Sequence, residues 1–117
     1  MKEFDYEGVT LKLGQCDSEN DRLIRESRPE HTWVHLNSFP SGHVVIQSPD
    51  VDANVLQVAA QICLQHSKVR SLKTAKAITT SVSNLKRTDA LGEVEFVSRR
   101  RTRTFPIVCR DVSSIAA

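Results

Sequence analysis

The sequence predicts an α+β fold: a mostly antiparallel sheet with two helices packed to one side. Runs of alternating or β-branched residues occur near both ends of the chain, and two stretches between them have helical spacing and capping residues. These elements do not alternate regularly, as they do in parallel α/β proteins. A chain of 117 residues has the length of one domain, so we expect a single domain over residues 1 to 117.

The first predicted elements are a strand and a short helix. From Val9 to Leu13, apolar and polar residues alternate, which is typical of a half-buried strand. A helix is expected over residues 18 to 28, because Asp17 or Ser18 can cap it and Pro29 prevents its continuation. It has few strongly apolar residues, so it should lie on the surface.

A hairpin with a turn-forming loop is predicted next. Its strands cover residues 32 to 36 and 43 to 47, and the loop between them is rich in Asn, Ser, Pro and Gly. Because neighbouring residues of a strand point to opposite faces, Trp33 and His35 should share one face. His35 and His43 should both lie near the mouth of the loop.

The strongest helical signal follows this hairpin. Asp52 is a good N-cap, and apolar residues such as Val55, Ala59 and Ile62 recur after it at helical spacing. No charged residue occurs from Ala53 to Gln65. Much of this helix should therefore be buried against the sheet.

The second half of the chain is predicted to be mostly β-structure. Strands are expected over residues 75 to 82, 93 to 97 and 104 to 109, with a loop over residues 83 to 88. The predicted order is thus strand, helix, two strands, helix and three strands. This order favours an α+β sheet over a parallel one.

Basic charge is concentrated in the second half of the chain. Residues 1 to 65 contain five Lys or Arg and ten Asp or Glu, whereas residues 66 to 117 contain eleven and four. The basic residues form three clusters: Arg99, Arg100, Arg101 and Arg103; Lys86 and Arg87; and Lys68, Arg70, Lys73 and Lys76. Such clusters are typical of nucleic-acid binding, and the alternative is a solvated sheet edge protected from aggregation.

Three further side chains are candidates for contacts with a base or phosphate. Trp33 could stack on a base, although a place in the core is the alternative interpretation. His35 and His43 could donate hydrogen bonds to a phosphate or a base, and a structural role is the alternative for both. Their spacing is not that of a zinc site.

Signals of catalysis, cofactors and membrane insertion are weak. Cys63 and His66 are three residues apart but share an apolar helix face, where a cysteine is usually inert. The chain has no GxxxxGK or GxGxxG loop, no CxxC pair and no apolar run near the roughly 20 residues of a membrane span. We therefore expect a non-catalytic intracellular protein without a cofactor, a metal or a membrane span.

An ordered series of motifs also resembles a known family. It consists of Gly14, Glu19-Asn20-Asp21-x-Leu23, Trp33-x-His35, Pro40-Ser41-Gly42-His43-Val44, Ser83-Asn84-Leu85-Lys86-Arg87-Thr88 and Gly92. In this order the motifs resemble the NFACT-R domain, in particular its stand-alone eukaryotic type, from about Tyr6 to Val112. The family's motif residues fall on Asn20, Asp21, Trp33, His35, Pro40, His43, Asn84 and Lys86.

The resemblance implies RNA binding in association with the ribosome or tRNA during translation quality control. The expected partners are tRNA or ribosomal RNA and the large ribosomal subunit, and the expected location is the cytoplasm, with the nucleus as an additional one. From the residues alone, a protein adaptor that docks an acidic surface, a DNA binder and a hydrolase that uses His35 or His43 remain alternatives. The candidate nucleic-acid-binding residues are Arg99, Arg100, Arg101, Arg103, Lys86, Arg87, Asn84, His35, His43, Trp33, Asn20 and Asp21.

Overall fold

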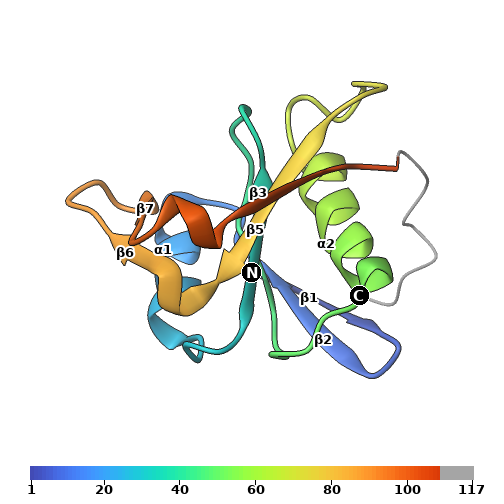
Figure 1. The fold of residues 1–117 in the computed structure, drawn as a ribbon. Coiled ribbons are helices and arrows are strands. Elements are labelled where there is room, and N and C mark those ends of the chain that lie inside the picture. Colours follow the sequence, from blue (N-terminus) through green and yellow to red (C-terminus); the bar gives the residue numbers. More distant parts are fainter. Residues whose placement is uncertain (109–117) are drawn as a thin grey trace.

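A six-stranded sheet forms the centre of the molecule (Figure 1). The computed structural model of the protein describes residues 1–108. The strands lie in the spatial order β1 (Lys2–Tyr6), β2 (Val9–Leu13), β4 (Val44–Ile46), β3 (Thr32–Leu36), β5 (Lys76–Ser81) and β8 (Arg103–Pro106), and each neighbouring pair is antiparallel. A separate antiparallel pair consists of β6 (Leu85–Arg87) and β7 (Val94–Phe96). The predicted α+β class and the mostly antiparallel sheet are confirmed.

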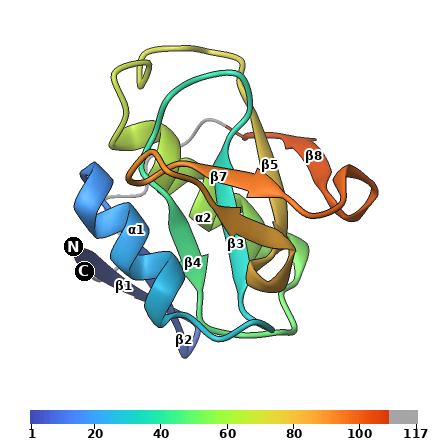
Figure 2. The ribbon, with the colours of Figure 1, turned by 90° about the vertical axis from the view of Figure 1, so that its left-hand side faces the viewer.

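The two helices lie on opposite faces of the sheet, not on one side as the sequence analysis expected. Helix α1 (Asp17–Glu26) and the β6–β7 pair cover one face, and α2 (Ala53–Gln65) covers the other (Figures 1 and 2). The reason is that the central strands are apolar on both faces. In β3, Val34 packs toward α2 whereas Trp33 packs toward α1. A sheet of this kind needs cover on each side.

The core under α2 is the larger of the two. Val34, Val44 and Ile46 of the sheet are fully buried there with Ile62 and other apolar residues of α2. Burial of one such side chain stabilises the fold by about 1.5–3 kcal/mol. The helix begins as predicted, because the Asp52 carboxylate accepts a hydrogen bond of 2.9 Å from the backbone N–H of Val55. Neither helix of residues 1–108 has the length and apolar character needed to cross a bilayer.

The core under α1 is smaller and contains the only tryptophan of the chain. Leu23 and Ile24 of α1 pack with Trp33 of β3 and Val45 of β4. Phe96 and other partly buried side chains of the β6–β7 pair close this core from the side. Helix α1 lies on the surface, as expected, with Arg22 and Arg25 exposed. Its two buried apolar residues are enough for a second core because the β6–β7 pair packs beside them.

One strand was missed, and the boundaries of several predicted elements were wrong. Strand β1 was missed, because only Phe4 of its five residues is buried. Helix α1 begins one residue earlier than expected, and its N-cap position is Cys16, without a capping side chain. Residues 82–84 form a 3₁₀ turn, η1 (Val82–Asn84), that leads directly into β6 instead of a loop. Strand β8 spans Arg103–Pro106, so it begins one residue earlier than expected and ends before residues 107 and 108; the last expected residue, 109, lies outside the described residues.

Gly42 allows the β3–β4 loop to approach the end of β2. A Cβ atom at this position would collide with the carbonyl oxygen of Gly14 and lie 2.8 Å from Cδ1 of Leu13. Both neighbours are buried, and Leu13 is the last residue of β2. The contact needs a residue without a side chain.

We expect Gly42→Ala to lower the free energy of unfolding by about 3 kcal/mol, the upper end for an overpacked core. Gly8→Ala is the matched control, because Gly8 has a φ of +79° but nothing within 4 Å of an added Cβ. That change should cost only about 1 kcal/mol of backbone strain. Urea unfolding followed by Trp33 fluorescence measures both, and equal costs for the two variants would contradict the close approach.

Candidate functional site

A cleft of about 430 Å³ opens between the β3–β4 hairpin and strand β7. Its lining includes Trp33, His35 and His43 from the hairpin, Phe96 from β7, and Arg99 from the 3₁₀ turn η2 (Arg99–Arg101). These residues come from distant parts of the sequence and from two layers of the fold. Four of these residues were predicted from the sequence as candidate site residues, whereas Phe96 was not. Its alternation with Glu95 and Glu93 was the available signal.

The floor of the cleft is a cluster of three rings. The Trp33 Nε1–H donates a buried hydrogen bond of 3.1 Å to Nδ1 of His43. The His35 ring stacks on the indole with the centroids 5.6 Å apart and an angle of 14° between the planes. The His35 and His43 rings meet edge to face at 5.0 Å. The expected proximity of the two histidines at the loop mouth is therefore present.

Both histidines of the cluster are neutral at pH 7. Burial lowers the pKa of His43 to about 3, and the nearby His35 would lower it further in the charged state. Burial also lowers the pKa of His35, against the effect of backbone carbonyl groups of Leu36 and Ser41. A base or acid that works near pH 7 needs a pKa near 7, so the environment of His43 does not suit that role.

Asn20 and Asp21 of α1 hold the backbone of His43 and strand β6 in place beside the cleft. The Asn20 side-chain oxygen accepts a hydrogen bond of 3.1 Å from the backbone N–H of His43. Asp21 binds Arg87 at 2.7 and 3.1 Å, and Arg25 at 2.9 Å. These guanidinium groups, that of Arg87 foremost, lower the pKa of Asp21 despite its burial. Because both side chains are buried and satisfied, they position the site more than they contact a ligand.

Asn84 fixes the turn that carries the arginines. Its side chain is fully buried, donates to Thr80 Oγ1 at 3.0 Å and to the Ser98 carbonyl at 2.8 Å, and accepts from the Ser98 N–H at 2.8 Å. The two bonds to Ser98 hold the residue immediately before η2. Asn84 thus has a structural role, and the exposed residues beside it are the ones that a ligand can reach.

The four arginines of the cluster divide between two cavities. Arg99 lines the aromatic cleft, with its guanidinium 5.9 Å from the centre of the Phe96 ring. Arg100, Arg101 and Arg103 line a second cavity of about 430 Å³ beside β5. Of these, Arg101 is held by the hydroxyl groups of Ser81 and Ser83, each at 2.9 Å.

The guanidinium groups of this cluster have no acidic partner among residues 1–108. Within residues 1–108, every ion pair involves other basic groups, and the one carboxylate in the second cavity, Glu30, lies 3.9 Å from Arg28. Arg87, by contrast, is neutralised by Asp21. Uncompensated charges at one turn favour an anionic ligand.

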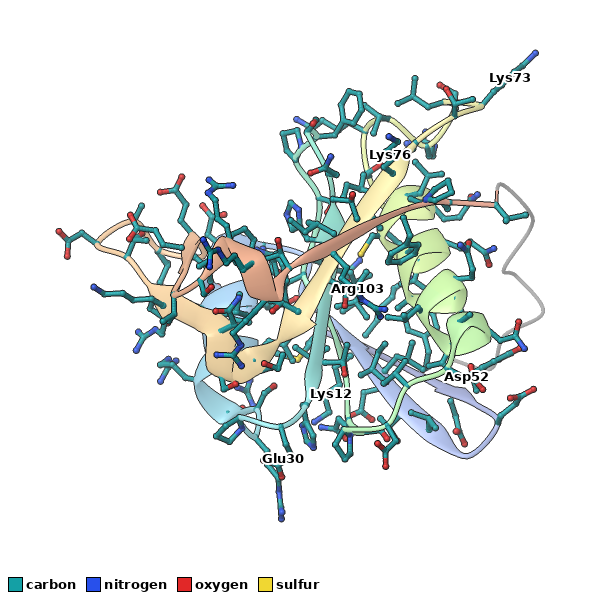
Figure 3. The ribbon with its side chains drawn as sticks, viewed as in Figure 1. Lys12, Glu30, Asp52, Lys73, Lys76 and Arg103 are labelled. Atoms are coloured by element: carbon teal, nitrogen blue, oxygen red, sulfur yellow. The ribbon has the colours of Figure 1, made fainter. Side chains whose placement is uncertain are left out.

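The remaining basic residues lie elsewhere. Lys86 is exposed on β6, away from the second cavity's lining. Lys73 lies in the loop before β5, Lys76 is the first residue of that strand, and both line a third cavity with Phe39 (Figure 3). The second half of the chain therefore presents separate basic surfaces, and Arg103 is distant from Lys73 in the view of Figure 3.

Cys63 and His66 do not form a nucleophile and base. The Cys63 thiol faces the carbonyl groups of Val34 and Gly42 at 3.6 and 3.8 Å, and burial raises its pKa to about 12. The His66 ring packs edge to face on Phe4 instead. Among residues 1–108, no three His, Cys, Asp or Glu side chains gather as metal ligands would.

The low pKa of His43 predicts a loss of stability in acid. An unfolded histidine titrates near 6.5, so between pH 6.5 and 3 the unfolded state binds one more proton than the folded state. Stability should be full above pH 6.5 and fall with decreasing pH by about 1.4 kcal/mol per unit from this group. His35 acts in the same direction.

The variant His43→Gln isolates this contribution, because its amide keeps an acceptor for Trp33 but does not titrate. We expect its free energy of unfolding to depend on pH less steeply than that of the wild type between pH 6 and 4. Urea unfolding at half-unit steps of pH measures the difference between the two proteins. The carboxylates contribute equally to both curves, so their effect cancels in this difference. Parallel curves would show that His43 is not buried in the neutral form.

Comparisons with known proteins agree with this architecture. The chain is 30% identical over 109 residues to the coiled-coil domain-containing protein 25 homolog of Dictyostelium discoideum, covering 85% of this chain and 52% of that protein. It is 27% identical over 81 residues to the Rqc2 homolog RqcH of Bacillus subtilis, covering 68% of this chain and 14% of RqcH. The chain thus spans about half or less of the length of these relatives.

A solved structure has the same fold. The C-terminal part of the fibronectin/fibrinogen-binding protein from Streptococcus suis superimposes with a TM-score of 0.88 at 18% identity, over 99% of this chain and 49% of that one. The family model described as the NFACT protein RNA binding domain matches residues 3–97. The resemblance found in the sequence motifs is confirmed, and the chain belongs to the NFACT-R family of RNA-binding domains.

Proposed function

We propose that the chain is a non-catalytic RNA-binding module that acts on tRNA or ribosomal RNA, at the large ribosomal subunit, in translation quality control. Its place of action would be the cytoplasm. The observation that carries this proposal is the turn η2 with the start of β8, whose four arginines have no acidic partner within residues 1–108 and line an aromatic cleft and a second cavity. Family membership and the similarity to RqcH support it.

The electrostatics favour a nucleic acid over an acidic protein surface. Guanidinium groups bind phosphate with paired hydrogen bonds, and release of counterions from a polyanion adds to the affinity. The side chains of Arg100 and Arg103 are exposed and make no hydrogen bond or ion pair with any residue of 1–108. Their ordering on a phosphate therefore breaks no existing interaction.

RNA is favoured over duplex DNA because of the neighbouring cleft. The aromatic groups lie in a hollow and not on a protruding helix or ribbon, so they suit unstacked bases more than a groove of B-form DNA. Single-stranded loops and ends are the parts of RNA in which bases are available for such contacts. The arginines would supply affinity and the cleft would supply the preference for unpaired segments.

We predict that Arg100→Ala with Arg103→Ala weakens RNA binding and reduces its salt dependence. Loss of two phosphate contacts should flatten the plot of log K against log salt by about 0.7 per contact for single-stranded RNA. Fluorescence anisotropy of labelled single-stranded RNA at several salt concentrations measures the slope. Neither arginine side chain has a hydrogen-bond or ion-pair partner within residues 1–108, and Ala at position 103 keeps the backbone pairing with β5, so the fold should be unchanged.

The matched control is Lys68→Ala with Arg70→Ala, which removes the same charge from another exposed surface. It should reduce affinity only slightly and leave the slope nearly unchanged. Equal effects of the two double variants would mean nonspecific attraction without a site at η2. Absence of RNA binding together with a tight acidic protein partner would replace the proposal with the adaptor function.

A further inference from the structure

We propose that the cleft between the β3–β4 hairpin and β7 binds a single unpaired nucleobase, whose edge is recognised by the imidazole groups of His43 and His35. The inference rests on the proposed RNA binding and adds the chemical group that this part of the surface selects. It follows from hydrogen-bond roles that the ring cluster imposes on each imidazole.

The tautomer of His43 is determined by Trp33. An indole N–H can only donate, so Nδ1 of His43, 3.1 Å away, must be the acceptor and the ring proton must lie on Nε2. That Nε2–H has no partner among residues 1–108. Within residues 1–108, the buried polar side-chain atoms without a partner are Nδ1 of His31 and Oε1 of Gln61. Nε2 of His43 is not one of them. The Nε2–H group of His43 therefore has no partner and is not fully buried, so it is a donor that is accessible from the cleft.

The tautomer of His35 is determined by the backbone. Its Nδ1 lies 2.7 Å from the Leu36 carbonyl oxygen, which can only accept, so Nδ1 carries the proton. Nε2 of the neutral ring is then an acceptor. The ring centroids of His35 and His43 are 5.0 Å apart. The cluster thus combines one free donor with one acceptor over a short distance.

An unpaired nucleobase complements this pair of groups. The Watson–Crick edge of each base has a hydrogen-bond acceptor beside a donor, and proteins read exposed bases on this edge. The low pKa values of both histidines support the assignment, because a charged imidazole would present only donors. The cleft volume of about 430 Å³ lies within the range of small-ligand sites.

The wall of the cleft provides stacking surfaces. Phe96 packs edge to face on Trp33 with the centroids 5.7 Å apart, and Arg99 extends over the Phe96 ring. Base stacking on an aromatic ring or a guanidinium plane is a common feature of single-strand recognition. Arg99 can also contact the phosphate of the same nucleotide.

The other groups in the cleft favour a base over a phosphate. Asp17 and Glu93 are part of the lining, and their carboxylates would repel a second phosphate but can accept from the amino group of a base. The cavity with Arg100, Arg101 and Arg103 contains one carboxylate, Glu30, which is close to Arg28. Phosphates are therefore expected at that cavity and a base in the cleft.

Trp33 gives a direct measurement of this inference, because it is the only tryptophan of the chain and lies in the cleft. The probes are a single-stranded RNA hexamer, an abasic hexamer with the same ribose-phosphate backbone, and a duplex of the same sequence. The hexamer should change the Trp33 emission saturably and bind about tenfold more tightly than the abasic probe, the gain expected from stacking of one base. The abasic and duplex probes should leave the emission unchanged.

Two variants separate recognition of the base from attraction of the phosphates. His35→Phe keeps a ring against Trp33 but removes the acceptor, so it should reduce the preference for the hexamer over the abasic probe. Arg100→Ala with Arg103→Ala should weaken both probes and keep that preference. Thermal unfolding verifies that each variant is folded.

The outcomes are distinct. Equal binding of the hexamer and the abasic probe, without a change in Trp33 emission, would overturn the base site while RNA binding through phosphates stands. A preference that persists in full in His35→Phe would overturn the assignment of the edge to the histidines. If neither probe binds at physiological salt, both the base site and the proposed function are wrong.

Discussion

The hydrogen bond between Trp33 and His43 is the constraint on which the second face of the sheet depends. An indole N–H buried without an acceptor costs about 1–3 kcal/mol, so the imidazole makes it possible to use Trp33 in this core. The backbone of His43 is held as well, because its N–H donates to Asn20 and its carbonyl accepts from Gly14 at 3.0 Å. His43 therefore connects helix α1, the loop after β2 and the cleft immediately before β4 begins.

A second set of contacts joins the β6–β7 layer to the rest. Asp21 of α1 binds Arg87 of β6, and Asn84 at the end of η1 holds Ser98 before η2. The motif residues thus fall into two groups. Those with buried, hydrogen-bonded side chains hold the strands and turns in place, and those with exposed side chains are available to a ligand. If substitution of Asn84 or Asp21 lowers the affinity for RNA, displacement of the turn η2 therefore explains the loss as well as removal of a direct contact does.

The sequence predicted the elements better than their arrangement. Asp52 and the uncharged stretch after it were sufficient for α2, and alternation placed Trp33 and His35 on one face. The placement of α1 opposite α2 depended on contacts distant in sequence, although the unbroken apolar run of β4 is typical of a strand buried on both faces. The division of the arginines could not be predicted, because it needs the 3₁₀ turn, in which successive residues point about 120° apart.

The placement of acidic residues explains why η2 is a positive surface, although the net charge of the chain is only +2. Asp21 compensates Arg25 and Arg87, Glu26 pairs with Arg22, and Glu30 lies near Arg28. Each of these carboxylates is on α1 or just after it. Only Glu30 of these three lines the cavity beside β5, where it lies 3.9 Å from Arg28, and none of the three forms an ion pair with an arginine of η2. A uniform distribution of the same acids would have left no local field for a polyanion to recognise.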